Sequence, residues 1–244
     1  MENKDINTFI EKAFSHFEKD RKDKIDLNFL KNKRLSDNEC LYLFDFPQNR
    51  ILYKKGFLNC LGYDDETITF DFLFNNIHPD DVKLVKRITR ISVQYSLDNP
   101  TNSSDNQLFI TYRHKTAKGN YIKILNQVTV FGVDKNNQLK TVLIRLLDIS
   151  FLDKTNIVNW TFRTSDLDED AFKKKIYKHN QNIFTPREKE LIREIVKGSA
   201  NKEIGALFRI SEHTVATHRK NILKKSGCHN FIELEIFCKG KGIL

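Results

Sequence analysis

Residues 184–190 read Phe-Thr-Pro-Arg-Glu-Lys-Glu, and residues 210–225 read Ile-Ser-Glu-His-Thr-Val-Ala-Thr-His-Arg-Lys-Asn-Ile-Leu-Lys-Lys. The first stretch predicts the start of a helix. Thr185 is a good N-cap, Pro186 suits the first helical position, and Glu188 completes a capping box. Helical spacing of apolar residues continues up to Gly198, which we expect to end this helix.

Three more helices are predicted after the first, at short intervals. The second covers about 199–208 and the third 211–226, where Ser211 is the N-cap and Gly227 ends the helix. The fourth covers about 230–239. Short connections favour one compact helical unit. In the second helix we expect Ile204, Leu207 and Phe208 to face inward. The apolar positions of the fourth helix are Ile232, Leu234, Ile236 and Phe237.

The third helix is predicted to have two different faces. Val215, Ile222 and Leu223 share an apolar face, and another face presents Ala216, Thr217, Lys220, Asn221 and Lys224. Residues 181–244 hold 12 Lys and Arg against 7 Asp and Glu, which is +5 of the chain's net charge of +9. A basic, amphipathic helix held by a turn is a device for reading the major groove of DNA. A merely solvated charged face is the alternative, and the agreement of caps, turns and patterning disfavours it.

This segment resembles the LuxR-type helix-turn-helix over residues 184–237. The resemblance is carried by Thr185-Pro186-Arg187-Glu188, Gly198, Asn201-Lys202-Glu203-Ile204, Leu207, Ile210-Ser211, Thr214-Val215, His218, Ile222-Leu223, Lys225, Gly227 and Glu233-Leu234. It implies an all-α, four-helix DNA-binding domain that acts as a dimer on inverted half-sites, with the fourth helix as the usual dimer contact.

The resemblance and the outward face together predict the DNA contacts. Three positions depart from the family pattern: Ala216 is often lysine there, Ser226 a buried leucine and Phe231 an arginine. The predicted base contacts are Ala216, Thr217, Lys220 and Asn221. The predicted phosphate contacts are Lys202, Thr214, His218, Arg219, Lys224 and Lys225.

The first part of the chain has the pattern of an α+β domain with a five-stranded antiparallel sheet. Two strands near 41–53 are followed by short helices, a long helix over about 81–97, and three strands over 108–114, 121–133 and 141–149. This order resembles the PAS sensor fold. The words that carry the resemblance are Leu61-Gly62-Tyr63, Ile77-His78-Pro79-Asp80-Asp81 and Leu147-Asp148-Ile149-Ser150. The resemblance implies a module that binds a small molecule or a protein and often dimerises.

The predicted organisation has four parts: an N-terminal helical extension (1–39), a PAS-like sensor or dimerisation domain (40–152), a linker (153–182) and the helix-turn-helix domain (183–244). Apolar residues at helical steps over 6–19 predict an amphipathic helix in the extension. Within the linker, residues 157–162 are a candidate for one more strand, and 171–178 for a short helix.

Cofactor and metal sites are not expected. His78 resembles a haem ligand, but bracing of the turn before the long helix is the better interpretation. Cys60 follows Asn59 as in flavin-binding light sensors, but the order of the motif differs, so we expect it to pack in the core. The four cysteines form no C-x-x-C pair, which disfavours zinc and favours reduced, packed thiols. A small-molecule ligand of the PAS-like domain is left open.

We therefore expect a one-component transcription regulator that binds double-stranded DNA as a homodimer, with RNA polymerase as a further candidate partner. The alternative is a protein-interaction module whose helical domain docks on a regulator or polymerase without reading DNA. An enzyme is not expected, because no catalytic constellation or phosphate loop is evident. The start of the chain does not resemble a signal peptide and no apolar run is long enough to span a bilayer, so a cytoplasmic protein is expected.

Overall fold

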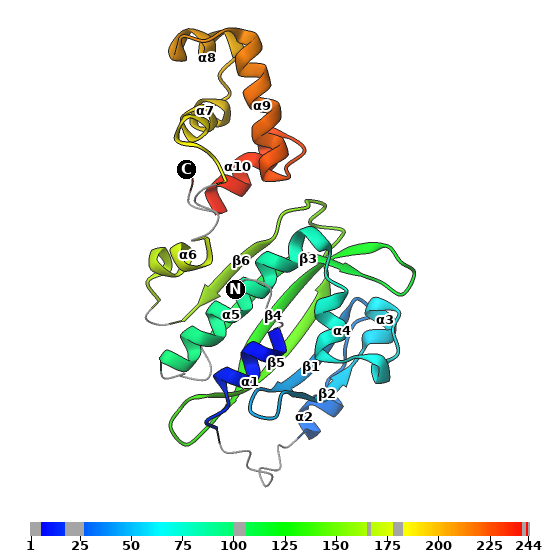
Figure 1. Cartoon of the computed structure of the whole chain (residues 1–244). Helices are drawn as coiled ribbons and strands as arrows, with labels where there is room; N and C mark the ends of the chain where they lie inside the picture. Colours follow the sequence, from blue (N-terminus) through cyan, green and yellow to red (C-terminus); the bar gives the residue numbers. More distant parts are fainter. Residues whose placement is uncertain are drawn as a thin grey trace. The chain divides into compact units, whose positions relative to one another are not determined.

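The computed structural model describes residues 6–17, 27–99, 106–164, 167–177, 183–240 and 243. The chain divides into two compact units. The sheet unit comprises residues 1–154 and 158–167, and the C-terminal unit comprises residues 155–157 and 168–244. The architecture is α+β, as predicted, with an antiparallel sheet in one unit and helices in the other (Figure 1).

The sheet has six antiparallel strands in the order β2-β1-β5-β4-β3-β6. The predicted order of strands and helices is confirmed, with β1 and β2 before the helices and β3, β4 and β5 after them. The PAS-like domain was expected to have five strands, and the candidate strand at 157–162 is present as β6, which pairs with β3 and makes six. The strands are β1 (Glu39–Asp45), β2 (Arg50–Lys55), β3 (Gln107–Lys115), β4 (Tyr121–Val133), β5 (Leu139–Asp148) and β6 (Asn159–Arg163).

The helices of the sheet unit pack against the sheet and one another. Figure 1 shows α5 and α1 lying across the same face of the sheet. The predicted apolar stripe of the first helix is confirmed within the described residues, where Ile6, Ile10 and Phe14 are buried. The helices are α1 (Ile6–Ala13), α2 (Asn28–Asn32), α3 (Phe57–Leu61), α4 (Phe70–Asn75) and α5 (Pro79–Asp98), with a 3-10 turn at Asp65–Thr67.

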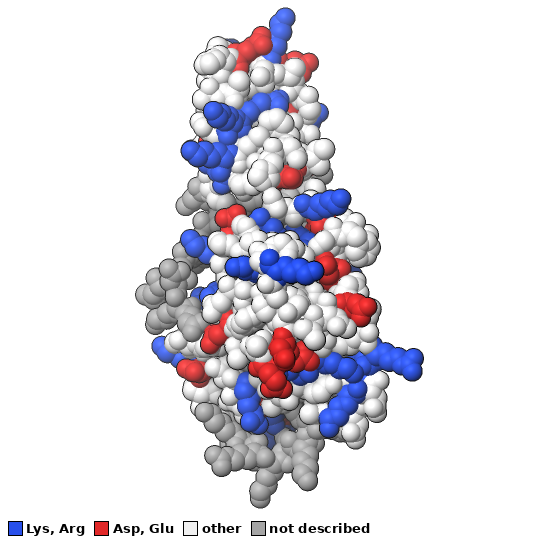
Figure 2. Space-filling view, turned by 90° about the vertical axis from the view of Figure 1, so that its right-hand side faces the viewer, with Lys and Arg blue, Asp and Glu red and all other residues white. Residues whose placement is uncertain are grey.

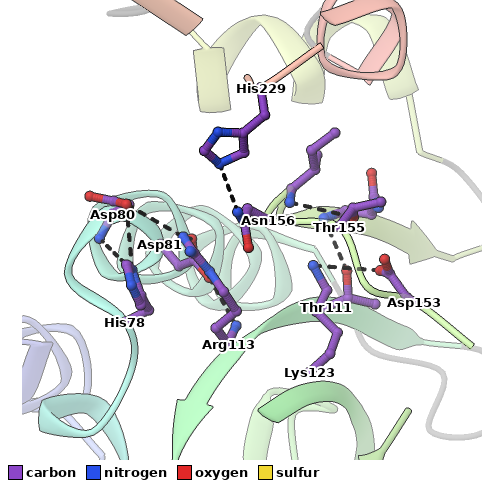
Figure 3. A network of polar contacts seen from close by, with 12 residues as sticks. His78, Asp80, Asp81, Thr111, Arg113, Lys123, Asp153, Thr155, Asn156 and His229 are labelled. Carbon is purple, nitrogen blue, oxygen red and sulfur yellow. Dashed lines mark hydrogen bonds and ion pairs between the residues drawn. The ribbon is translucent and has the colours of Figure 1, made fainter. Parts of the chain in front are cut away.

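A polar network fixes the start of the long helix α5 (Figure 3). His78 is its N-cap, and the Nδ1 atom accepts a hydrogen bond from the Asp80 N–H at 3.2 Å. The buried carboxylate of Asp81 accepts from the backbone N–H, Nε and Nη2 of Arg113 at 2.9, 3.0 and 2.7 Å. The interpretation of His78 and its neighbouring carboxylates as braces of this turn is confirmed. The network joins the helix to strand β3.

The C-terminal unit contains five helices within its described residues. They are α6 (Glu169–Tyr177), α7 (Pro186–Val196), α8 (Asn201–Phe208), α9 (Glu212–Ser226) and α10 (Phe231–Gly240). Leu191, Ile192, Ile204, Val215 and Ile222, which come from α7, α8 and α9, form the centre of its core. Leu234 and Phe237 of α10 complete that core. The predicted helix-turn-helix arrangement is thereby a single packed body.

All four cysteines are buried, as expected for thiols that pack in the core. Across the described part of the chain, no cluster of His, Cys, Asp and Glu side chains could bind a metal ion. The same residues include no helix with the length and hydropathy needed to cross a bilayer.

Candidate nucleic-acid interface

Helix α7 begins with the capping box that the sequence predicted. The Thr185 hydroxyl accepts a hydrogen bond from the Glu188 N–H at 3.2 Å, and the Glu188 carboxylate accepts from the Thr185 N–H at 2.9 Å. Two N–H groups that lack helical partners are thus satisfied reciprocally. Leu191, Ile192 and Ile195 then face the core.

The turn between α8 and α9 requires close contact between backbones. Helix α8 ends at Arg209, whose φ of 54° lies in the left-handed region, and α9 begins after the N-cap Ser211. The Ser211 hydroxyl accepts from the Thr214 N–H at 3.0 Å. A Cβ atom on Gly205 would lie 2.8 Å from the Ile210 carbonyl oxygen. Glycine is therefore needed for α8 to approach the turn this closely.

Helix α9 has a buried face and an exposed face on opposite sides. Val215 and Ile222 are fully buried in the core of the unit. With 3.6 residues per turn, Ala216, Thr217, Lys220, Asn221 and Lys224 lie within an arc of about 140°, centred opposite those two residues. All five are exposed. At the top of Figure 2, blue Lys and Arg side chains gather on one flank of the C-terminal unit.

Two basic residues of α9 make contacts within the domain. The Lys225 ammonium lies 2.8 Å from both carboxylate oxygens of Glu188, which joins the end of α9 to the start of α7. Arg219 donates to the Ser199 carbonyl oxygen, and its guanidinium lies over the Phe231 ring, 4.8 Å from the centroid. This stacking gives Phe231, which departs from the family pattern, a defined partner on α9.

The pKa values of Glu188 and Arg219 are shifted from their ordinary values. Burial alone would raise the pKa of Glu188, but hydrogen bonds from Lys225 and Thr185 outweigh it and hold that pKa below its ordinary value. Burial lowers the pKa of Arg219. The Glu188 carboxylate therefore stays charged at neutral pH and keeps Lys225 in place.

The structure places the predicted DNA-contact residues on α8 and α9. They differ in exposure and in whether they make contacts within the domain. The four predicted base contacts are exposed on α9. Among the predicted phosphate contacts, Lys202 and Lys224 are exposed, Thr214 and His218 are half-buried, and Arg219 and Lys225 are engaged as described. Their roles toward DNA stay predictions.

One expected packing position is corrected. Leu207 was expected to face inward but is 62 % exposed. Ile204 is buried in the core of the unit, and Phe208 packs against that core. On α10, Leu234 and Phe237 are buried, whereas Ile232 and Ile236 are 73 % and 40 % exposed. Sequence reasoning missed the Glu188–Lys225 contact and the Arg219–Phe231 contact. The unusual aromatic residue at position 231 was a signal for the second contact only.

Comparison with known proteins agrees with this geometry for the C-terminal segment. Residues 182–237 match the family described as "Bacterial regulatory proteins, luxR family". Helices α7 to α10 are thus a LuxR-type helix-turn-helix domain. The chain is 46 % identical over 55 residues to the "Uncharacterized response regulatory protein YgeK" of Escherichia coli K12, a match that covers 22 % of this chain and 37 % of that one. It is 46 % identical over 56 residues to the "Uncharacterized transcriptional regulatory protein YhcZ" of Bacillus subtilis 168, covering 23 % and 24 %. The matches span between about a quarter and about two fifths of these relatives.

A longer match is found with a solved structure. The Vibrio cholerae VqmA dimer, described as a LuxR-type receptor, aligns with 84 % of this chain and 83 % of its own, at 14 % identity and a TM-score of 0.34.

Proposed function

We propose that this protein is a DNA-binding transcription regulator, in which the PAS-like sheet unit senses a signal and the helix-turn-helix binds operator DNA. The observation that carries the proposal is the exposed face of α9, which lies opposite a fully buried face that packs against α7 and α8. A helix with this arrangement can enter the major groove while its buried face stays packed against the core. No catalytic role is proposed.

The proposed contacts follow from exposure along α9. Lys220 and Asn221 are long enough to reach base edges, and Thr217 and Ala216 offer a hydroxyl and a methyl group. Lys202 and Lys224 supply exposed positive charge for phosphates, supported by Thr214 and His218. Arg219 and Lys225 contact Ser199 and Glu188 within the domain. We propose that their main role is to orient α9 and that contact with phosphates is a lesser role.

The proposal includes a homodimer. Ile232 and Ile236 lie four residues apart on α10 and are both exposed, so they form one apolar strip on that helix. We propose that this strip pairs two copies on inverted half-sites, with RNA polymerase as a further partner. A location in the cytoplasm follows from the need to reach DNA.

The test is fluorescence anisotropy with labelled DNA. Random-sequence duplex at low salt is titrated first, and a preferred duplex is then selected from a random pool with the wild-type protein. We expect binding to both, with affinity that falls steeply as salt rises, because Lys contacts to phosphates release counterions. Absence of any duplex binding at low salt would instead favour a module that docks on another protein.

Single lysine substitutions separate the two kinds of contact. We expect Lys220→Ala to weaken binding to the selected duplex by about 1–3 kcal/mol, with less effect on random duplex. Lys224→Ala should weaken both alike and reduce the slope of log K against log salt by about 1. Lys118→Ala, an exposed lysine of the sheet unit, removes the same charge and is the matched control. Equal effects of Lys118→Ala and Lys220→Ala would show that α9 is not the reading helix.

A further inference from the structure

Helix α9 carries an exposed side chain that the predicted DNA contacts leave out, the imidazole of His213, the second residue of the helix. With about 100° of rotation per residue, His213 lies within about 10° of the line directly opposite the buried residues Val215 and Ile222. Ala216 and Asn221 lie about 70° to either side of that line. His213 is therefore closer to the centre of the exposed face than two of the four predicted base contacts.

His213 begins a straight line of side chains along α9. Thr217, Lys220 and Lys224 follow it at steps of four, three and four residues, so the four side chains lie within an arc of about 60°. All four are exposed. Side chains of a helix tilt toward its N-terminus, so His213 is the leading group of this line. In helix-turn-helix proteins, the N-terminal residues of the recognition helix are the ones that contact base edges.

The start of α9 lies away from the surface proposed for the dimer. In Figure 1, α9 begins beside α8 and ends beside α10, the helix that carries Ile232 and Ile236. Pairing of two copies through these isoleucines would therefore leave His213 open to DNA.

The hydroxyl groups near His213 are used within the helix. The Ser211 hydroxyl accepts from the Thr214 N–H at 3.0 Å, and the two hydroxyl oxygens lie 2.8 Å apart. The Thr217 hydroxyl donates to the His213 carbonyl oxygen at 3.1 Å, so toward DNA it can only accept. Ala216 offers only a methyl group. Among residues 212–218, all of which the structure describes, His213 is the exposed side chain that still has a hydrogen-bond donor to offer.

The His213 ring has no hydrogen bond, ion pair or ring contact with any residue that the structure describes. Arg219 and Lys225 would have to break contacts within the domain to bind DNA, whereas His213 would not. A neutral imidazole has one N–H donor, and a charged one has two. In the major groove, guanine presents the two acceptors N7 and O6, whereas adenine presents N7 beside a donor. The chemistry of the ring therefore favours guanine.

We propose that His213 is a further base-reading residue of α9, which recognises a guanine about three base pairs from the base read by Lys220. For a helix that lies along the groove, seven residues at about 1.5 Å each span about 10.5 Å, and base pairs are about 3.4 Å apart. The inference deepens the proposed function and rests on it.

The test is selection of duplexes from a random pool by the full chain, as wild type, His213→Ala and Lys220→Ala, with sequencing of the bound duplexes. His213→Ala should lose the base preference at one position of each half-site. That position should lie about three base pairs from the one that Lys220→Ala loses. By anisotropy, His213→Ala should weaken binding to the wild-type duplex about tenfold and binding to random duplex less than about twofold. Alanine is the better helix former, so this variant should fold.

A second variant separates base reading from a structural role. Glutamine pairs with adenine through N6 and N7. His213→Gln should therefore select adenine in place of guanine at the same position, a change that a residue acting only on the fold would not produce. His16→Ala, which removes an exposed histidine of the sheet unit, is the matched control and should change neither affinity nor base preference.

The inference is overturned if His213→Ala binds the wild-type duplex as tightly as the wild-type protein does. It is also overturned if selected and random duplexes lose affinity equally, because the contact is then with phosphate. In either case, a loss of specific binding by Lys220→Ala in the same experiment leaves the proposed function standing. If the wild type binds no duplex at low salt, the regulator itself fails, and the inference fails with it.

Discussion

Gly205 lies at the closest approach between α8 and the turn that leads into α9. Its Cβ-less backbone leaves room for the Ile210 carbonyl oxygen, which a methyl group would meet at 2.8 Å. The clash is with backbone and not with a flexible side chain, so relief requires the turn to move. Because the turn leads directly into α9, the missing Cβ atom of Gly205 bears on how α9 is held.

We expect Gly205→Ala to destabilise the C-terminal unit by about 1–3 kcal/mol, although alanine is the better helix former. The measurement is thermal unfolding followed by circular dichroism at 222 nm. The fluorescence of Trp160, which belongs to β6, should be unaffected because it reports on the sheet unit.

Ala206→Gly is the control on the same helix. Ala206 is exposed, so its replacement costs only helix propensity, about 1 kcal/mol. Stabilisation by Gly205→Ala would contradict the steric argument.

At the scale of elements, α7 and α9 are joined by Glu188, which acts in two ways. Its carboxylate completes the cap of α7 and also binds Lys225 from the end of α9. The carboxylate is buried, whereas the lysine is 43 % exposed. The contact therefore holds the end of α9 against the start of α7.

Glu188→Gln should destabilise the C-terminal unit by about 1–2 kcal/mol at pH 7, through loss of the ion pair and weakening of the cap. The pKa of Glu188 is lowered in the folded state. Its contribution is therefore complete above the ordinary glutamate pKa of about 4.3 and is lost as pH falls through the lower folded value.

The difference between wild type and Glu188→Gln should thus shrink below pH 4.3 in melting curves recorded between pH 7 and pH 3. Glu190→Gln removes an exposed carboxylate paired with Arg187 and should change stability by less than about 0.5 kcal/mol. A difference that is constant with pH would show that Glu188 acts by packing alone.

At the scale of the whole molecule, the proposed dimer depends on a surface that the single chain leaves exposed. Ile232 and Ile236 contribute nothing to the core of their own unit, which uses Leu234 and Phe237 from the same helix. Two exposed isoleucines on one face of a helix favour an apolar contact with a second copy of the chain.

We expect Ile232→Glu to lower affinity for a selected duplex with two inverted half-sites about tenfold or more, because the second copy no longer adds its contacts. Affinity for a duplex with one half-site should not change. Leu58→Glu, at an exposed apolar position of the sheet unit, is the control. Unchanged affinity for both duplexes would place dimerisation elsewhere, whereas equal losses on both would show that the substitution disturbs the fold of the unit itself.

Much of the fold could be predicted because its signals are local. The Thr185 cap, the breaks at Gly198 and Gly227, and the stripes of α1 and α9 are each readable within a window of a few residues. The cap of α5 by His78 belongs to the same kind. The residues expected on the exposed face of α9 are exposed, since helical periodicity alone decides which residues share a face.

The sequence by itself determined where helices and strands begin, which faces are apolar and where positive charge gathers, because these depend on neighbours within one or two turns of chain. Only the tertiary structure decided the pairing of β6 with β3, the contact of Glu188 with Lys225, and the stacking of Arg219 on Phe231. Each of these joins residues that are distant in the chain. Their proximity is set by how whole elements pack, which no local pattern of residues encodes.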